Sequence, residues 1–326
     1  MADQPGQGTL PVATSEPLAR YLGPARRYAS LSKSPRTLKA YESDWADFTE
    51  FCWRSGQPSL PAAPETVALY LTYLVDEQKR KSSTLTRRLA ALSQAHQAAG
   101  LPTPTGESVV RSVMAGIRRV HGTQPAAKTA LSPEVLKRIV AGLPDTPRGR
   151  RDRALLLVGF TGALRRSELV ALRVEDVAFE GEGMVLTIPR SKTDPEAAGQ
   201  LVGIPRGQTH ETCPVRALEA WLETAGITEG PLFRPIERWS GTVLPRALED
   251  RRVATLLKEL VGRAGLDPAA FAGHSLRSGL ATAAAAGGAS ERAIMDQTRH
   301  RSVKQVRRYI QRGSLFRDNA ASYTGV

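Results

Sequence analysis

The second half of this chain carries basic side chains and one tyrosine whose types and order suit the cleavage of a phosphodiester. In chain order they are Arg165, Lys192, His274, Arg277, His300 and Tyr309. A phenol has an ordinary pKa of about 10, so it is a moderate nucleophile and its phenolate leaves readily when a reaction reverses. Such a nucleophile can attack a phosphodiester and keep the phosphate as an ester, which conserves the energy of the broken bond.

Each basic side chain has a role in that chemistry. The transition state gathers negative charge on the non-bridging phosphate oxygens, and the fixed guanidinium forks of Arg165 and Arg277 are suited to stabilise it. Lys192, on an expected turn between two strands, could protonate the leaving sugar oxygen, although lysines in such turns are commonly solvated. His274 could hold the phosphate or accept the tyrosine proton, and His300 could donate a hydrogen bond to a phosphate oxygen.

The assignments of Arg165 and Tyr309 each have an alternative, and Glu168 has a supporting role. Glu168 follows Arg165 by one helical turn, so we expect it to support the arginine or a histidine rather than to react. Arg166 is an alternative phosphate ligand. A lone tyrosine near a C-terminus is commonly a packing residue, and Tyr309 alone would be read that way. The basic partners upstream of it favour the nucleophile instead.

The segments that carry these residues resemble the signature motifs of the tyrosine recombinases, also called the phage integrase family. Residues 161–172 resemble the first motif, and the pair His274 and Arg277 resembles the second. His300, followed nine residues later by Tyr309, resembles the last. Each motif alone is loose, but their order on plausible secondary structure makes the set specific.

The resemblance covers roughly residues 131–309 and implies a reaction. Tyr309 would form a 3′-phosphotyrosyl bond and free a 5′-hydroxyl, and a 5′-hydroxyl from a partner duplex would then displace the tyrosine. In the family this happens in a tetramer on two sites, through a Holliday junction, without metal or cofactor. We therefore expect double-stranded DNA with short inverted-repeat sites as the partner, and no small-molecule ligand.

The chain resembles the simple two-domain members of the family, similar to the Cre and Xer groups, without an added arm-binding domain. Two other functions use related residues. A type IB topoisomerase would relax supercoils with a similar set, but the order of the motifs and the small size favour recombination. A DNA-binding regulator with a decayed site is the second alternative, and the presence of every reacting residue argues against it.

Two positions depart from the family pattern. Arg299 precedes His300 where glycine is frequent, so we expect this turn to avoid a left-handed backbone. Ser278 follows Arg277 where a second histidine or arginine is frequent. Neither departure removes a reacting group.

The composition favours a polyanionic partner. Lys and Arg total 45 against 32 Asp and Glu in 326 residues, a formal charge of +13 with a pI near 10.2. We expect no membrane span and no secretory signal, and hence a cytoplasmic, nucleoid-associated protein. Cys52 and Cys213 suggest no disulfide, and His210 beside Cys213 lacks the second pair that a metal site needs.

Hydrophobic periodicity predicts a mainly α protein. We expect an all-helical N-terminal core-DNA-binding domain of the SAM-like type. A mixed, mainly helical catalytic domain follows, with a small antiparallel sheet that pairs 184–189 with 201–205. The predicted parts are a disordered arm (1–33), the helical domain (34–120), a linker (121–130) and the catalytic domain (131–326), with a tail from 311.

Several basic residues are candidates for contact with the DNA backbone. Phosphate contacts position a protein on DNA but carry no sequence information, so these residues cannot name a target site. His96 and His121 are expected to be structural or surface residues. The DNA-contact candidates are Lys81, Arg87, Arg88, Arg118, Arg119 and Arg190.

Overall fold

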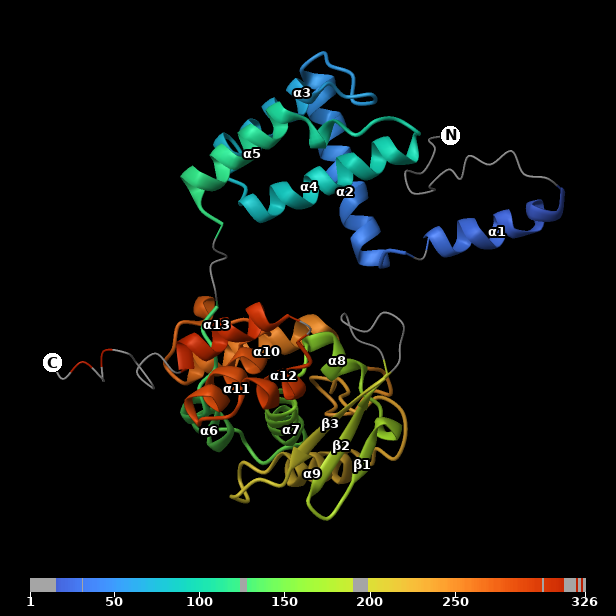
Figure 1. The fold of residues 1–326 in the computed structure, drawn as a ribbon. Helices are drawn as coiled ribbons and strands as arrows, with labels where there is room; N and C mark the ends of the chain where they lie inside the picture. The colour runs from blue at the N-terminus through green and yellow to red at the C-terminus, as the bar shows by residue number, and fades with distance from the viewer. Residues whose placement is uncertain are drawn as a thin grey trace. The chain divides into compact units, whose positions relative to one another are not determined.

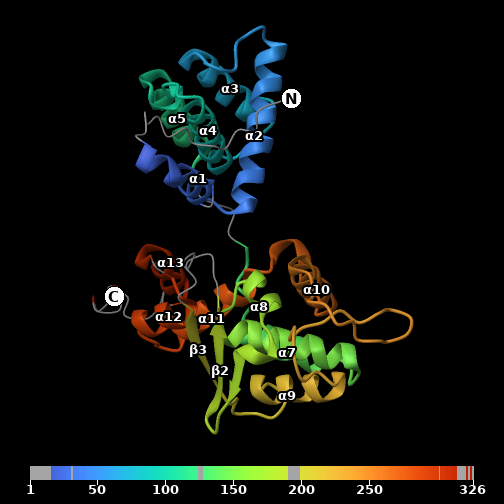
Figure 2. The ribbon, with the colours of Figure 1, turned by 90° about the vertical axis from the view of Figure 1, so that its right-hand side faces the viewer.

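The computed structural model divides into two compact units, Met1–Ala127 and Lys128–Val326 (Figures 1 and 2). It describes residues 16–30, 32–123, 128–189, 199–300 and 302–313, together with positions 321 and 324. The first unit is helical throughout its described residues, and the second combines helices with one three-stranded antiparallel sheet. The prediction of a mainly helical chain with a small antiparallel sheet is therefore confirmed.

Helix α2 of the first unit begins at a side-chain cap. Ser34 accepts a hydrogen bond from the Thr37 N–H at 3.2 Å, and Pro35 occupies the first helical turn, where its missing N–H costs nothing. The elements are α1 (Glu16–Ser30), α2 (Pro35–Arg54), α3 (Pro64–Asp76), α4 (Ser82–Ala98), η1 (Pro104–Gly106) and α5 (Ser108–His121).

Helix α1 corrects one expectation, because residues 16–30 were predicted to belong to a disordered arm. The glycines and prolines of the N-terminal segment suggested disorder. Within 16–30, however, the strong helix formers Leu, Ala and Arg recur and outweigh the single internal Pro24. Residues 1–15 of the predicted arm lie outside the described residues.

His96 is a core residue of the first unit. Its Nε2 accepts a hydrogen bond from the Ala62 N–H at 3.0 Å, so its Nδ1 carries the proton and donates to the Leu92 carbonyl at 2.8 Å. The ring is fully buried beside Trp45, with the two centroids 6.1 Å apart. Both ring nitrogens are satisfied by the fold, which gives this histidine a structural role.

The second unit places its sheet and helices around one core. The strands pair in the order β1-β2-β3, and Met184 faces Ile204 in the pairing of β2 with β3. The sheet comprises β1 (Val177–Phe179), β2 (Gly183–Ile188) and β3 (Gln200–Pro205). The helices are α6 (Pro133–Ala141), α7 (Pro147–Thr161), α8 (Arg166–Ala171), η2 (Val174–Asp176), α9 (Pro214–Ala225), α10 (Asp250–Arg263), η3 (Pro268–Ala270), α11 (Ser275–Ala286), α12 (Glu291–Thr298) and α13 (Val303–Gly313).

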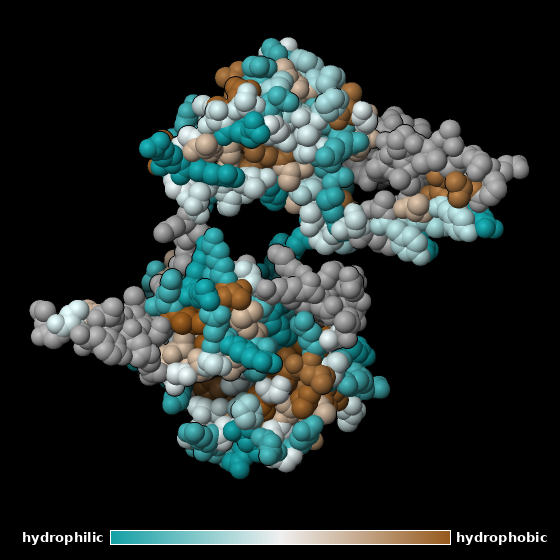
Figure 3. Space-filling model, viewed as in Figure 1, coloured by the Kyte–Doolittle hydropathy of each residue, from teal (hydrophilic) through white to brown (hydrophobic). Residues whose placement is uncertain are grey.

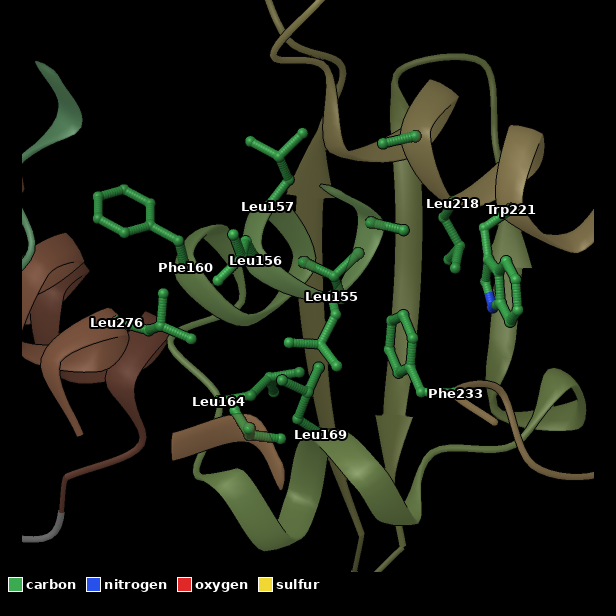
Figure 4. Packing of buried hydrophobic residues seen from close by; sticks show 14 of the residues in the cluster. Leu155, Leu156, Leu157, Phe160, Leu164, Leu169, Leu218, Trp221, Phe233 and Leu276 are labelled. Atoms are coloured by element: carbon green, nitrogen blue, oxygen red, sulfur yellow. The ribbon is translucent and has the colours of Figure 1, made fainter. Parts of the chain in front are cut away.

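Helix α7 is the centre of this core. Its side chains point toward α11 on one side, where Phe160 lies near Leu276, and toward the sheet and α9 on the other (Figure 4). Gly159 allows close packing, because a Cβ there would lie 2.9 Å from Leu169 and 3.2 Å from Leu276. The buried helix therefore fixes the turn that follows it, which is where the candidate site begins.

The surface of both units mixes hydrophilic and hydrophobic side chains (Figure 3). Trp239, which is 88% exposed, stacks with the guanidinium of Arg238 at 5.2 Å from the ring centroid. Among the described residues, no helix combines the length and the hydrophobicity that crossing a membrane requires.

The chain enters the second unit against α11. The Thr129 N–H donates to the Ala270 carbonyl at 2.8 Å, and the Leu131 N–H donates to the Ser275 carbonyl at 3.0 Å. The Leu131 carbonyl also lies over Gly279, where an added Cβ would approach it to 2.2 Å. Only glycine permits this contact without a shift of the backbone.

We therefore expect Gly279→Ala to lower the free energy of unfolding of the second unit by about 1–3 kcal/mol, the usual cost of overpacking a core. Gly181→Ala is the matched control, because a Cβ at Gly181 would meet nothing within 4 Å. Chemical denaturation followed by circular dichroism measures both. Equal stability of the two variants would contradict the close contact.

Candidate active site

Four helices of the second unit bring five of the six predicted reacting residues together. Arg165 caps the start of α8, His274 caps the start of α11, and Arg277 lies in the first turn of α11. His300 follows α12 directly, and Tyr309 lies on α13. The predicted sixth member, Lys192, and its neighbour Arg190 both lie outside the described residues.

The tyrosine lies against two histidines of the same chain. The Tyr309 hydroxyl is 2.9 Å from Nε2 of His274, a hydrogen-bond distance. The Tyr309 ring centroid lies 5.8 Å from that of His300 and 6.5 Å from that of His274. The half-buried phenol is therefore held by its contact with His274.

The protonation states of these rings follow from their surroundings. Burial raises the pKa of Tyr309, and the charges of Arg277 and Arg308 offset only part of that rise. Desolvation of its ring lowers the pKa of His274, and the positive charges of Arg277 and Arg165 lower it further. At neutral pH the phenol is protonated and the imidazole is neutral, so Nε2 of His274 can accept the phenol proton.

Arg277 is almost completely buried and bonds to backbone carbonyls from two other segments. Its Nη1 donates to the Ala163 carbonyl at 2.7 Å and its Nη2 donates to the Thr298 carbonyl, while Nε has no partner among the described residues. Burial, reinforced by the nearby charges of Arg165 and Arg299, lowers the pKa of Arg277 to about 9, so the guanidinium is cationic at neutral pH.

Glu168 holds the second guanidinium of the site. Its Oε1 accepts from Nη1 of Arg165, and its Oε2 accepts from the Arg165 backbone N–H at 2.9 Å and from Nη2 of Arg299 at 2.8 Å. Burial alone would raise the pKa of Glu168. The Arg165 N–H and the charges of Arg299 and Arg165 outweigh burial, so the pKa lies below its ordinary value. The carboxylate is ionised and orients Arg165.

Arg299 corrects a second expectation, since we predicted that this turn would avoid a left-handed backbone. The residue has φ 54° and ψ 44°, which is the left-handed helical region, and it caps the end of α12. A residue with a side chain costs roughly 1–2 kcal/mol in that region. The prediction was wrong because it considered only the backbone. The buried guanidinium bonds to Glu168 and to the Gly162 carbonyl at 3.1 Å.

Thr298 determines which nitrogen of His300 carries the proton. The Thr298 hydroxyl donates its single hydrogen to the Ile294 carbonyl at 2.6 Å. Nδ1 of His300 lies 2.7 Å from the same oxygen and must therefore donate to it. The neutral ring then presents the lone pair of Nε2 to the site. The expected donation from His300 to a phosphate oxygen consequently requires the ring to be protonated.

Arg88 is a structural residue of the first unit. Its guanidinium lies in ion pairs with Asp44 and Asp47 and also donates to the Tyr70 hydroxyl, and the side chain is buried. This placement replaces the hypothesis that Arg88 contacts DNA. Its neighbour Arg87 is half exposed and pairs with Asp44 at 2.6 Å.

The other DNA-contact candidates of this unit are exposed. Lys81 precedes α4, and Arg118 and Arg119 lie in the last turn of α5. Arg118 donates to the Thr86 hydroxyl at 3.3 Å, which links α5 to α4. The side chains of Lys81, Arg118 and Arg119 are all exposed to solvent.

The described residues include no group of three His, Cys, Asp or Glu side chains that could hold a metal ion. Cys213 is buried, and its Sγ accepts a hydrogen bond from the Gly207 N–H at 3.2 Å.

Sequence reasoning missed a further polar contact behind the site. The Gln297 amide donates to the Thr161 carbonyl at 2.7 Å and to the Gly203 carbonyl at 3.1 Å, which ties α12 to α7 and the sheet.

The family model described as "Phage integrase family" matches residues 129–314. The chain belongs to this family. The matched segment contains every reacting residue described above. The resemblance inferred from the motifs is therefore confirmed.

Curated relatives match over most of the chain. An integrase/recombinase xerD homolog of Selenomonas ruminantium is 44% identical, with 91% of this chain and 87% of that protein covered. Recombinase cre of Escherichia phage P1 is 29% identical, with 85% and 84% covered. Among solved structures, the XerH site-specific recombinase in its post-cleavage complex has a TM-score of 0.66 at 15% identity over 93% of this chain and 84% of that one, which shows the same fold.

The Thr298–His300 contact is open to a direct test by nitrogen-detected NMR of the histidine rings. In the DNA-free protein we expect the His300 ring to carry its proton on Nδ1 and to become cationic only as the pH falls toward about 4, because burial and nearby arginines lower its pKa. Thr298→Val removes the acceptor and should populate the other tautomer. Thr298→Ser keeps a hydroxyl and should behave as wild type. A wild-type ring protonated on Nε2 at neutral pH would refute the assignment.

Proposed function

We propose that this chain is a site-specific tyrosine recombinase in which Tyr309 is the nucleophile. The observation that carries the proposal is the phenol oxygen of Tyr309, which lies 2.9 Å from Nε2 of His274, beside the guanidiniums of Arg165 and Arg277 at the starts of α8 and α11. Membership of the family supports the same reading, since its relatives are named as recombinases.

The proposed reaction begins with proton transfer. The Tyr309 hydroxyl gives its proton to Nε2 of His274, and the phenolate oxygen attacks the phosphorus. The bond from phosphorus to the 5′ oxygen breaks, and that oxygen takes up a proton, for which Lys192 is the proposed donor. A 3′-phosphotyrosyl ester and a free 5′-hydroxyl result. A 5′-hydroxyl from a second duplex then displaces the tyrosine, and no high-energy cofactor is consumed.

The arginines stabilise the charge that develops on the phosphate. Arg165 is oriented by Glu168 through both its side chain and its backbone N–H. Arg277 has an Nε–H without a partner among the described residues, which an anionic group could satisfy. His300 would contribute once the phosphate has raised its pKa enough to protonate Nε2.

The assembly is proposed from the family and the charge. We infer that the protein acts on short inverted-repeat sites in double-stranded DNA as a tetramer, through a Holliday junction, in the cytoplasm on the nucleoid. Lys81, Arg87, Arg118 and Arg119 are proposed to contact the DNA backbone, with Arg190 as a further candidate. The tail from residue 311 is proposed to reach a neighbouring protomer. It begins inside α13, and most of it lies outside the described residues.

Tyr309→Phe tests the nucleophile. On a nicked suicide substrate the wild type should accumulate a covalent protein–DNA adduct, visible on a denaturing gel, whereas the variant should form none because it lacks the attacking oxygen. Both proteins should bind the DNA with similar affinity. Tyr73→Phe, which removes a hydroxyl from the first unit, is the matched control and should form adduct normally. An adduct formed by Tyr309→Phe would identify another nucleophile.

Substitution of Arg165 and of its neighbour Arg166 tests which of the two arginines binds the phosphate. Arg165→Ala should slow adduct formation at saturating DNA by roughly a hundredfold or more, the scale for loss of one transition-state donor. Arg166→Ala should stay within a few-fold of wild type, because its side chain packs over Gly273 rather than on Glu168. If the two effects are reversed, Arg166 is the ligand.

A two-site recombination assay run beside a supercoil-relaxation assay separates a recombinase from a topoisomerase. A recombinase exchanges strands between the two sites, whereas a topoisomerase relaxes supercoils without pairing them.

A further inference from the structure

The position before His300 carries a buried arginine in a left-handed conformation, although glycine would adopt that backbone without strain. We propose that Arg299 is a positioning residue for the strand-transfer reaction. It supplies the counter-charge that lets Glu168 orient Arg165, and it fixes the turn on which Arg277 is anchored. The proposal rests on the proposed recombinase function.

The guanidinium of Arg299 reaches across from the end of α12 to the turn between α7 and α8. Its Nη1 donates to the Gly162 carbonyl at 3.1 Å and to the Gln297 carbonyl at 3.2 Å. Its Nη2 donates to Oε2 of Glu168 at 2.8 Å and to the Ala163 carbonyl at 3.4 Å. The planar guanidinium can donate hydrogen bonds to a carboxylate and to backbone carbonyls at the same time. A lysine ammonium has a different geometry and cannot reproduce this set of bonds.

The ion pair with Glu168 has an electrostatic consequence for Arg165. Glu168 contributes one negative charge directly beside Arg165, and that charge alone would offset the attraction of Arg165 for a phosphate. With Arg299 in place, three buried or half-buried guanidiniums (those of Arg165, Arg277 and Arg299) surround the single carboxylate. Glu168 can therefore orient Arg165 by hydrogen bonds while its own charge is shared with Arg299.

The turn is fixed by the same side chain. The Ala163 carbonyl accepts from Nη1 of Arg277 at 2.7 Å as well as from Arg299. Ala163 itself has φ 46°, so a second left-handed residue lies in this contact. A left-handed residue with a side chain persists only where its surroundings hold it. Arg299 provides part of that restraint, and through Ala163 it acts on the placement of Arg277.

The competing interpretation is that Arg299 only ties α12 to the core and has no effect on the reaction. That interpretation predicts a loss of stability without a change in the rate of the chemical step. The rate of adduct formation at saturating DNA, in a variant that folds, therefore separates the two interpretations. The pKa of His300 reports on the charge alone: burial and the charges of Arg277, Arg165 and His274 lower it, and the charge of Arg299 adds to them.

The first experiment measures single-turnover adduct formation at saturating DNA on a nicked substrate. Arg299→Gly keeps the left-handed backbone free of strain but removes the guanidinium. It should bind DNA within about threefold of wild type and form adduct about tenfold or more slowly, the scale of a displaced reacting group. Arg299→Lys should fall between the two. Arg292→Ala, an exposed arginine of the same helix, is the matched control and should keep the wild-type rate.

Adduct formation by Arg299→Gly at the wild-type rate would overturn the proposal. If neither Arg299→Gly nor Arg299→Lys folds, by circular dichroism, Arg299 is a structural residue and the proposal also fails.

The second experiment needs no DNA. A double-mutant cycle of Arg299→Gly with Glu168→Gln should show non-additive unfolding free energies, and NMR should show a higher His300 pKa in Arg299→Gly than in wild type. Additive energies with an unchanged His300 pKa would refute the ion-pair role. If the wild type forms no adduct on any substrate, the proposed function fails, and this second experiment still decides whether Arg299 positions Glu168.

Discussion

Glu168 keeps a negative charge at a position nearly closed to water, and the site depends on how that charge is held. A buried carboxylate is stable only when paired and hydrogen-bonded, since an isolated one would be neutralised. Here it accepts hydrogen bonds from Arg165 twice and from Arg299 once. These bonds lock the start of α8 to the end of α12. Two segments distant in sequence thus share one electrostatic centre.

Burial, reinforced at the two histidines by the neighbouring cations, determines the protonation of the other titratable groups in the site. Burial and the neighbouring arginines make both histidines harder to protonate, and burial makes the Tyr309 phenol harder to ionise. The DNA-free site is therefore a neutral acceptor, His274, beside a neutral donor, Tyr309. An anion placed among these groups would raise the pKa of both histidines, because a negative charge stabilises the protonated ring.

Local sequence was sufficient for much of the architecture. Ser34 with Pro35 marks a helix start that the structure shows with its cap bond, and two short apolar runs predicted the pairing of 184–189 with 201–205. These features depend on residues that are close together in the chain. The candidate reacting residues were chosen for a related reason, because Arg165, His274, Arg277, His300 and Tyr309 follow one another in the order that the resemblance to the family implies. The expectation of disorder failed for 16–30, where helix propensity outweighed composition.

Only the tertiary structure shows which charged side chains are buried and which groups they pair with. Arg88 looked like a surface cation, yet it is buried against Asp44 and Asp47 from another helix. Arg299 looked like a tolerated substitution for glycine, yet its guanidinium crosses to Glu168. The proton position on the His300 ring depends on one neighbouring hydroxyl whose own hydrogen is committed elsewhere. Residue types and their order therefore determined which chemistry is available, because chemistry belongs to the functional groups. Burial, pairing and tautomer came from the fold, because they depend on atoms that the chain brings together from distant positions.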